Sequence, residues 1–160
     1  MYKTAPKKHS TFRKKTRELL MRLIFQCTAS HDFSEEAKER FLEDETMMDG
    51  LFSSESDEHP DLIYFNYGFA SLLEHLEEID ETIASASEKW AIGRMNAVDL
   101  AILRLAGAEI LFLDDISDRI SANEAVVMAK RYGTDKSPAF INGIIGSIVR
   151  KKEEGIGGPI

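Results

Sequence analysis

The feature that most constrains the fold is the apolar run at positions 100–113, in which Arg104 and Glu109 are the only polar side chains. A helix over this run is apolar on nearly every side, so other helices must surround it. Asn96 and Asp99 lie just before the run, where an amide can cap the first backbone N–H groups and a carboxylate suits the positive helix end. We therefore expect a central helix that is enclosed by the rest of the chain.

The same run lacks the length of a membrane span. A spanning helix needs roughly 20 consecutive, predominantly apolar residues, whereas this run is shorter and carries two charged side chains. We expect a soluble protein that does not enter a membrane. Arg104 and Glu109 are not spaced to pair within one helix, so each should pair with a neighbouring helix or with backbone. For Glu109 this favours a structural role over a catalytic one.

Apolar side chains recur at helical spacing along most of the chain, and no alternating β pattern is present. We expect the other helices to begin at Ser10 or Thr11, at Ser34, near Asp61, at Asp80, at a Ser121–Glu124 capping box, and at Ser137. Gly68, inside one of them, indicates a close approach of two helices. The predicted fold class is all-α, a single globular domain of about seven helices packed around the central apolar helix. It should span residues 10–154, between a mobile basic arm at residues 1–9 and a frayed tail at residues 155–160.

Charge is distributed unevenly along this chain, whose net charge is −8. Residues 1–22 carry eight basic side chains and one acidic side chain, and residues 130–152 carry six basic and one acidic. Residues 35–61 carry eleven acidic side chains and two basic ones, and the Ser-rich positions 46–60 within them predict a long loop. We therefore expect a molecule with a basic face and an acidic face.

No residue pattern indicates catalysis or a bound cofactor. The four histidines show no metal-ligand spacing, and the sequence has no G-x-x-x-x-G-K-[ST] phosphate-binding loop. Neither the single cysteine, Cys27, nor any serine lies in a nucleophile motif. A lone cysteine and the absence of an evident export signal suit a reduced cytoplasm. We expect a cytoplasmic protein that is not an enzyme, with no cofactor and no metal.

The first helix carries a cluster of basic residues. Arg13, Lys14, Lys15 and Arg17, together with Glu18, are expected on its surface, because apolar residues form a separate stripe at helical spacing. Two structural explanations compete with a functional one: the cations could be ordinary solvated charge, or they could contact the acidic segment of the same molecule.

Aromatic residues in the C-terminal basic segment favour a nucleic-acid surface. Tyr132 and Phe140 lie on either side of Lys136 along the chain. If this turn packs beside the first helix, cations and stackable rings would share one surface, which suits the unstacked bases of single-stranded RNA. Taken singly, each ring is better explained by core packing.

Several strings resemble the NusB family of bacterial transcription antitermination factors. The family's arginine-rich opening resembles R-K-K-T-R-E at positions 13–18, and its core helix resembles N-A-V-D-L-A-I-L-R-L-A-G-A-E-I-L at positions 96–111. Its C-terminal signature resembles N-E-A-V, A-K-R-Y-G and F-I-N-G-I-I, which lie between positions 123 and 145. Their order and spacing match over positions 13–149, whereas positions 30–60 match poorly.

The resemblance implies an all-helical NusB fold that binds boxA-like single-stranded RNA. It also implies a heterodimer with NusE, a small-subunit ribosomal protein, within the RNA polymerase antitermination complex that supports ribosomal RNA transcription. By position it implies RNA contacts from Arg13, Lys14, Lys15, Arg17, Lys136 and Phe140, and a partner contact from Asp99. The family usually has arginines at the positions of Lys14 and Lys15. Lysine lacks the bidentate fork of arginine, so phosphate contacts are favoured there over base-specific ones.

Two other functions are compatible with the sequence. The NusB fold also forms the N-terminal RNA-binding domain of certain ribosomal RNA cytosine methyltransferases, and this chain would then be a stand-alone RNA-binding domain, since it shows no Rossmann-like pattern. A non-catalytic protein-interaction adaptor would also suit the acidic surface. Charge reversal at Arg13 and Arg17 distinguishes an RNA binder, which would lose affinity, from an adaptor, which would keep its partner.

Overall fold

The computed structural model describes residues 10–88 and 90–156. Within these residues the chain forms only helices: α1 (Ser10–Ser30), α2 (Glu35–Glu43), η2 (Glu45–Met48), α3 (Leu62–Ala86), η3 (Ile92–Arg94), α4 (Ala97–Phe112), α5 (Asp118–Tyr132) and α6 (Ser137–Ile156). The all-α prediction is confirmed, with six α-helices in the described residues, fewer than we expected. The arm expected at residues 1–9, and residues 157–160 of the expected tail, lie outside the described residues.

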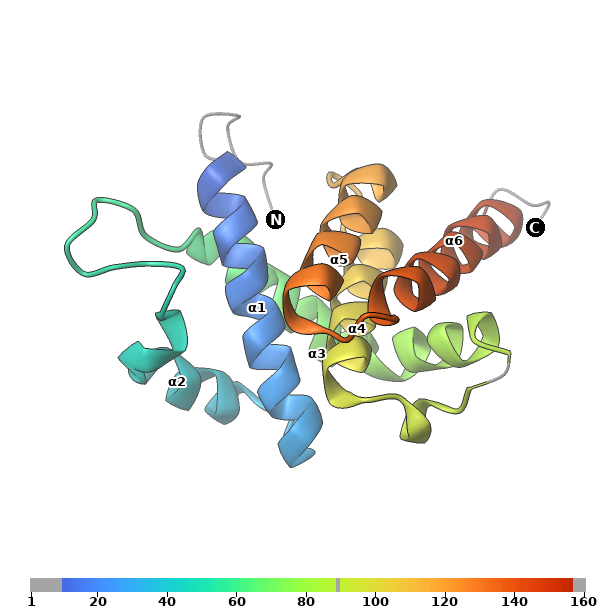
Figure 1. The fold of residues 1–160 in the computed structure, drawn as a ribbon, viewed down its shortest axis with the longest axis horizontal. Helices are drawn as coiled ribbons and strands as arrows, with labels where there is room; N and C mark the ends of the chain where they lie inside the picture. The colour runs from blue at the N-terminus through green and yellow to red at the C-terminus, as the bar shows by residue number, and fades with distance from the viewer. Residues whose placement is uncertain (1–9, 89, 157–160) are drawn as a thin grey trace.

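Helix α4 is the centre of the fold. It packs against α1, α3, α5 and α6, and Figure 1 shows these helices around it. Every residue from 99 to 110 is buried, as the apolar sequence predicts. The Asp99 backbone N–H donates to Asn96 Oδ1 at 2.8 Å, which confirms the expected helix cap. Neither α4 nor any other described helix has the combination of length and hydropathy that crossing a membrane requires.

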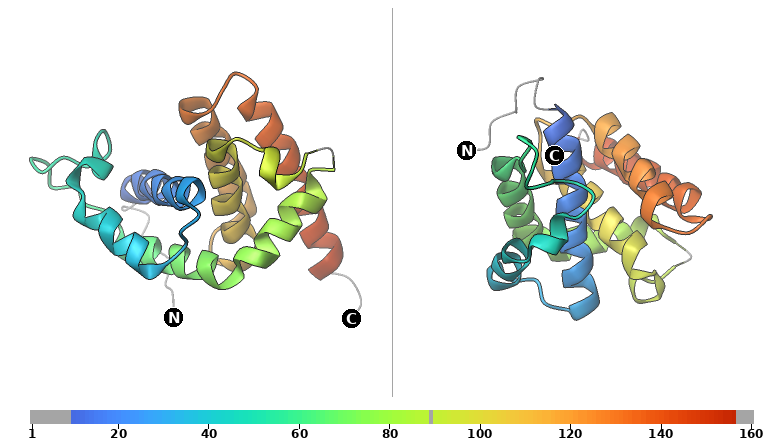
Figure 2. Two further views of the ribbon diagram at one scale, coloured as in Figure 1. Left: turned by 90° about the horizontal axis from the view of Figure 1, so that it is seen from below. Right: turned by 60° about the vertical axis from the view of Figure 1, so that its left-hand side comes forward.

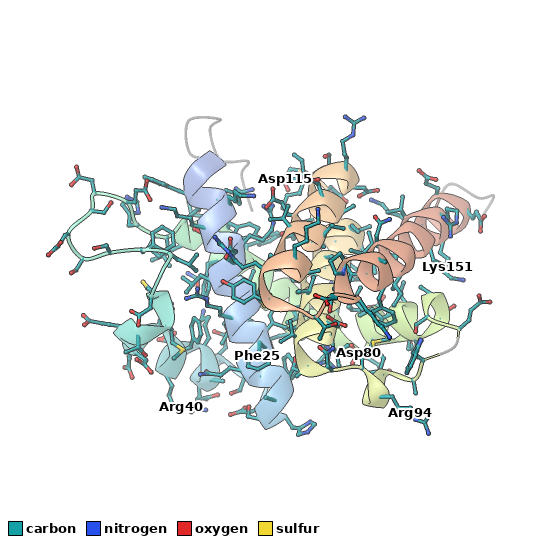
Figure 3. All side chains as sticks on the ribbon, viewed as in Figure 1. Phe25, Arg40, Asp80, Arg94, Asp115 and Lys151 are labelled. Atoms are coloured by element: carbon teal, nitrogen blue, oxygen red, sulfur yellow. The ribbon has the colours of Figure 1, made fainter. Side chains whose placement is uncertain are left out.

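The two charged side chains of α4 pair with other helices, as expected. The Arg104 guanidinium donates to both carboxylate oxygens of Asp80 on α3, each at 2.9 Å, and to the Thr28 hydroxyl on α1 at 3.0 Å. Figure 3 labels Asp80 among the other side chains. Glu109 binds three helices at once and is described with the site. Such pairing offsets the cost of removing a charge from water.

Helix α3 consists of two helical segments that meet at a kink, so the expected second segment exists, but its start at Asp80 is wrong because the kink lies at His75. Its backbone leaves helical geometry at His75, with φ −117° and ψ 18°, and Figure 2 shows the bend. The His75 ring stacks on the Phe112 ring of α4, with centroids 3.7 Å apart. Asp80 resembled a helix cap in the sequence, but its carboxylate binds Arg104 instead.

Helix α5 begins one turn earlier than the sequence predicted. The Ile120 backbone N–H donates to Ser117 Oγ at 3.2 Å, so Ser117 is the cap. The capping box expected at Ser121 and Glu124 is wrong, because both side chains make tertiary contacts. Ser121 donates to Glu109 at 2.7 Å, and Glu124 accepts from Lys14 at 2.9 Å.

Gly68 marks a close contact between α3 and α1, as expected. A Cβ atom at this position would lie 2.8 Å from Leu20 Cδ2. That separation is shorter than van der Waals contact, and Leu20 is fully buried. Glycine therefore allows the two helices to approach closely.

A long loop connects η2 to α3, as predicted, and we refer to residues 50–60 as the acidic loop. It begins at Gly50, whose φ of 81° lies in the left-handed region that favours glycine. Asp61 follows the loop and caps α3 by accepting a hydrogen bond from the Tyr64 backbone N–H at 3.1 Å. The loop contains three acidic side chains and no Lys or Arg. Figure 1 shows that it extends beside the first half of α1.

Candidate nucleic-acid interface

Helix α1, which carries the predicted basic site, lies between the acidic loop and α5 (Figure 1). Its four predicted RNA-contacting residues are directed at four different parts of the fold. They form the ion pairs Arg13–Asp61, Lys14–Glu124, Lys15–Glu58 and Arg17–Glu109. The contact with the acidic segment that we considered as an alternative explanation therefore exists, and Lys15 makes it with the acidic loop.

The Arg17–Glu109 pair lies in the core. The Arg17 Nε–H donates to Glu109 Oε2 at 2.8 Å, and the two side chains are only 5% and 1% exposed. Tyr64 of α3 and Ser121 of α5 donate their hydroxyl groups to the same carboxylate. Glu109 thus joins α1, α3 and α5 to α4, which confirms the structural role that we expected for it. The prediction that Arg17 and Glu18 lie on the surface is wrong, because both are buried.

The buried surroundings of Glu109 shift the pKa values of Arg17 and Tyr64. Burial alone would lower the pKa of Arg17, but Tyr64 and Glu109 together raise it above its ordinary value, so the guanidinium stays charged. Burial and the neighbouring Glu109 raise the pKa of Tyr64 well above its ordinary value, so its hydroxyl remains a donor. Both effects maintain the hydrogen bonds to Glu109.

A second polar network joins the middle of α1 to the end of α5. The Arg131 guanidinium and the Tyr132 hydroxyl donate to Glu18 at 2.9 Å and 2.8 Å. Arg22 donates to the Tyr132 hydroxyl at 3.0 Å and, on its other side, to the Asp49 carbonyl at 2.7 Å. Arg22 therefore connects α5, through Tyr132, to the start of the acidic loop.

The connecting roles of Glu18, Arg22 and Arg131 were not predicted from the sequence. A signal was present, because Glu18 and Arg22 are spaced four apart and so share one face of α1. The Tyr132 hydroxyl is hydrogen-bonded, and burial raises the pKa of this residue. Its ring lies beneath the Arg22 guanidinium, whose central carbon is 5.8 Å from the ring centroid.

Lys14 and Lys15 supply the accessible positive charge of α1. Their side chains are 48% and 35% exposed, in contrast to Arg17. The Lys15 Nζ atom also lies 6.0 Å from the centroid of the Phe52 ring in the acidic loop. Arg13 is directed inward, with its guanidinium 4.5 Å from the centroid of the Tyr64 ring. The basic cluster therefore divides into two outer lysines and two inner arginines.

Lys136 and Phe140 lie at the turn from α5 to α6. This turn begins at Tyr132, whose hydroxyl contacts α1, so the turn starts beside the middle of α1. Lys136 is exposed, whereas Phe140 is half-buried and packs on the core. The Phe140 ring meets the Trp90 ring edge-on, with centroids 6.4 Å apart.

Asp99 occupies the first turn of α4, and α1 and α4 begin at opposite ends of the view in Figure 1. The residue is only 6% exposed. Its Oδ2 atom accepts a hydrogen bond from Asn96 Nδ2 at 3.1 Å. Its buried Oδ1 atom has no hydrogen-bond partner within the described residues. A buried carboxylate oxygen without a hydrogen-bond donor lowers stability.

Comparisons with known sequences agree on one family. The model of the NusB family matches residues 14–150. The chain is 34% identical over 139 residues to the transcription antitermination protein NusB of Clostridium novyi, covering 86% of this chain and 98% of the relative. It is 38% identical over 144 residues to the same protein of Natranaerobius thermophilus, covering 87% of this chain and 95% of the relative.

Solved structures show the same fold. NusB of T. maritima superposes with a TM-score of 0.70 at 30% identity, covering 93% of this chain and 94% of that structure. A crystal structure of the antitermination factors NusB and NusE in complex with dsRNA matches with a TM-score of 0.69 at 24% identity, covering 87% of this chain and 96% of the matched chain. At that lower identity, the likeness establishes the fold alone.

Proposed function

Because this chain belongs to the NusB family, we propose that it is a transcription antitermination factor that binds boxA-like single-stranded RNA together with NusE. Its relatives are named transcription antitermination proteins, and a NusB of the same fold has been crystallised with NusE and dsRNA. In this role the protein acts in the cytoplasm as a non-catalytic part of the RNA polymerase antitermination complex.

The observation that carries the RNA role is the pair of accessible lysines on an ordered helix. Lys14 and Lys15 extend from α1 and are held by one carboxylate each. Lysine binds phosphate as a point charge, so these residues suit the RNA backbone. Lys136 is exposed and extends the surface, and the half-buried Phe140 supplies an aromatic ring on which a base can stack.

Arg13 and Arg17 act in this proposal mainly by positioning α1. Arg17 is buried against Glu109 and keeps little surface for a ligand. Arg13 pairs with Asp61 and lies over Tyr64, and both of these residues belong to the start of α3. These contacts hold the register of the helix that presents the lysines.

Asp99 supports the proposed contact with NusE. Its Oδ1 atom has no donor in the described part of the chain, and a basic ribosomal protein could supply an N–H donor if the first turn of α4 opens on binding. The net charge of −8 adds a favourable long-range field for such a partner.

The test is fluorescence anisotropy of a short boxA-like RNA and a scrambled control, each with and without NusE, at two salt concentrations. We expect preferential binding of the boxA-like RNA that weakens with salt and tightens with NusE. Equal, weak binding of both RNAs under every condition would overturn the RNA role. Binding of NusE without any RNA binding would favour the adaptor instead.

A further inference from the structure

The acidic loop contacts the part of α1 that we propose for RNA. Glu58 accepts a hydrogen bond from Lys15 Nζ. The His59 ring meets the Phe12 ring with centroids 5.4 Å apart, and Phe52 lies beneath the Lys15 ammonium. An anionic side chain therefore already holds one of the two lysines that α1 presents outward.

We propose that Glu58 occupies the position of an RNA phosphate on Lys15, so that the acidic loop inhibits RNA binding until RNA displaces it. The inference rests on the proposed RNA function. A carboxylate and a phosphate oxygen both accept from an ammonium group, so the two compete for the same Nζ atom. The loop adds three negative charges beside the RNA path, which also repel the backbone.

The Lys15–Glu58 pair is suited to exchange. The two side chains are 35% and 34% exposed, and ion pairs between exposed partners contribute little to stability. The buried pair that Arg17 of α1 forms with Glu109 of α4 is the opposite case, because both side chains are nearly inaccessible. Helix α1 thus combines a permanent ion pair with a replaceable one.

The loop is held at its two ends and spans a hollow between them. At its start, Arg22 donates to the Asp49 carbonyl at 2.7 Å. Just beyond its end, the Asp61 backbone N–H donates to Thr16 Oγ1 at 2.9 Å. Between these points the loop borders a cavity of about 850 Å³ that Phe52, Glu58 and His59 help to line. The central residues can therefore leave Lys15 while the attachments to α1 remain.

The experiment compares Glu58→Gln with Glu55→Gln in binding a boxA-like single-stranded RNA, by fluorescence anisotropy. Both changes remove one negative charge from the acidic loop, but Glu55 is exposed and has no side-chain contact with α1 among the contacts described. We expect Glu58→Gln to lower the Kd roughly two- to fivefold, the range expected for loss of one exposed ion pair. Glu55→Gln should change the Kd less.

A comparison of the Lys15→Gln single variant with the Lys15→Gln, Glu58→Gln double variant tests the Lys15–Glu58 contact. In a Lys15→Gln background, adding Glu58→Gln should change the Kd no more than Glu55→Gln does in the unaltered protein, because no ammonium remains to be released and only the general loss of one negative charge is left. Equal gains from Glu58→Gln and Glu55→Gln, or no gain from either, would overturn the inference while leaving the RNA function intact. Failure of the unaltered protein and of every variant to bind the RNA would instead remove the proposed function, and this inference with it.

Discussion

The Arg17 Nε atom lies 2.8 Å from Glu109 Oε2, so a cation of the basic motif is neutralised inside the core. The sequence motif R-K-K-T-R-E therefore combines two tasks: its lysines are presented outward, and Arg17 fixes the helix that presents them. This division of tasks leads to separate expectations for stability and for binding.

Arg17→Ala should lower the free energy of unfolding by about 3–5 kcal/mol, because it leaves the Glu109 carboxylate buried without its cation. Urea denaturation measures the change. Arg40→Ala is the control, since it removes an exposed ion pair with Asp32 and should cost no more than ~1 kcal/mol. Similar losses in the two variants would contradict the role assigned to Arg17.

Replacing Lys14 and Lys15 together by Gln should weaken RNA binding and flatten its salt dependence. Each lost phosphate contact reduces the slope of log K against log salt by about 0.7 for a single strand. Anisotropy titrations at several salt concentrations measure the slope. Lys151→Gln, at an exposed cation of α6 that Figure 3 labels, should leave the slope unchanged. An unchanged slope in the double variant would exclude these lysines from the RNA contact.

Two helical glycines should respond in opposite directions to alanine. Gly68→Ala forces a Cβ atom to 2.8 Å from buried Leu20 and should cost about 1–3 kcal/mol of unfolding free energy. Gly143→Ala meets nothing within 4 Å and should gain up to ~1 kcal/mol through helix propensity. Thermal unfolding of both variants measures the two changes in stability. Stabilisation by Gly68→Ala would show that α1 and α3 do not need their close approach.

Stability should decline in alkaline solution partly through Cys27. Burial and the nearby Asp32 raise the pKa of this thiol from 9.0 to about 11. Above pH 9 the unfolded thiol ionises while the folded thiol keeps its proton, so unfolding is favoured by about 1.4 kcal/mol per pH unit until the folded pKa is reached. The stability advantage of the unaltered protein over Cys27→Ala should therefore shrink between about pH 9 and about pH 11. A constant difference in urea denaturation would contradict the raised pKa.

Asp99→Ala should weaken binding of NusE and spare binding of RNA. Removing a carboxylate that hydrogen-bonds across an interface costs about 2 kcal/mol or more, roughly a 30-fold rise in Kd. Calorimetric titration with NusE measures this rise, and the RNA titration serves as the internal control. Asp114→Ala, at an exposed acid just after α4, should have little effect on either ligand. Unaltered NusE affinity in Asp99→Ala would exclude Asp99 from the partner site.

The local sequence pattern correctly predicted the central helix α4 and its cap. The apolar run of α4 and its Asn96 cap depend on neighbours in the sequence, and both were recognisable there. The errors at Asp80 and at Ser121 have a common cause. Each residue is a good helix-starting type whose side chain binds a charged group of α4 instead. Such long-range pairing overrides a local capping preference and is invisible to spacing rules.

Long-range pairing also explains what could not be predicted of the candidate site. Charge and family resemblance identified the basic motif, but helical spacing alone placed Arg17 outside. Its burial depends on Glu109, which lies far away in the sequence. An acidic residue inside an otherwise apolar helix needs a cation, and that requirement was the one available clue. The Lys15–Glu58 contact depends on the path of a loop, for which the sequence carries no periodic signal.

The network around α1 has a consequence for the order of events during synthesis. The contacts of Glu18 with Arg131 and of Arg17 with Glu109 span 113 and 92 positions of sequence. Helix α1 leaves the ribosome first, yet its partners on α4 and α5 are made much later. Before α4 is made, the nascent chain lacks both the main surface on which α1 packs and the carboxylate that pairs with Arg17, so α1 completes its packing only late in synthesis.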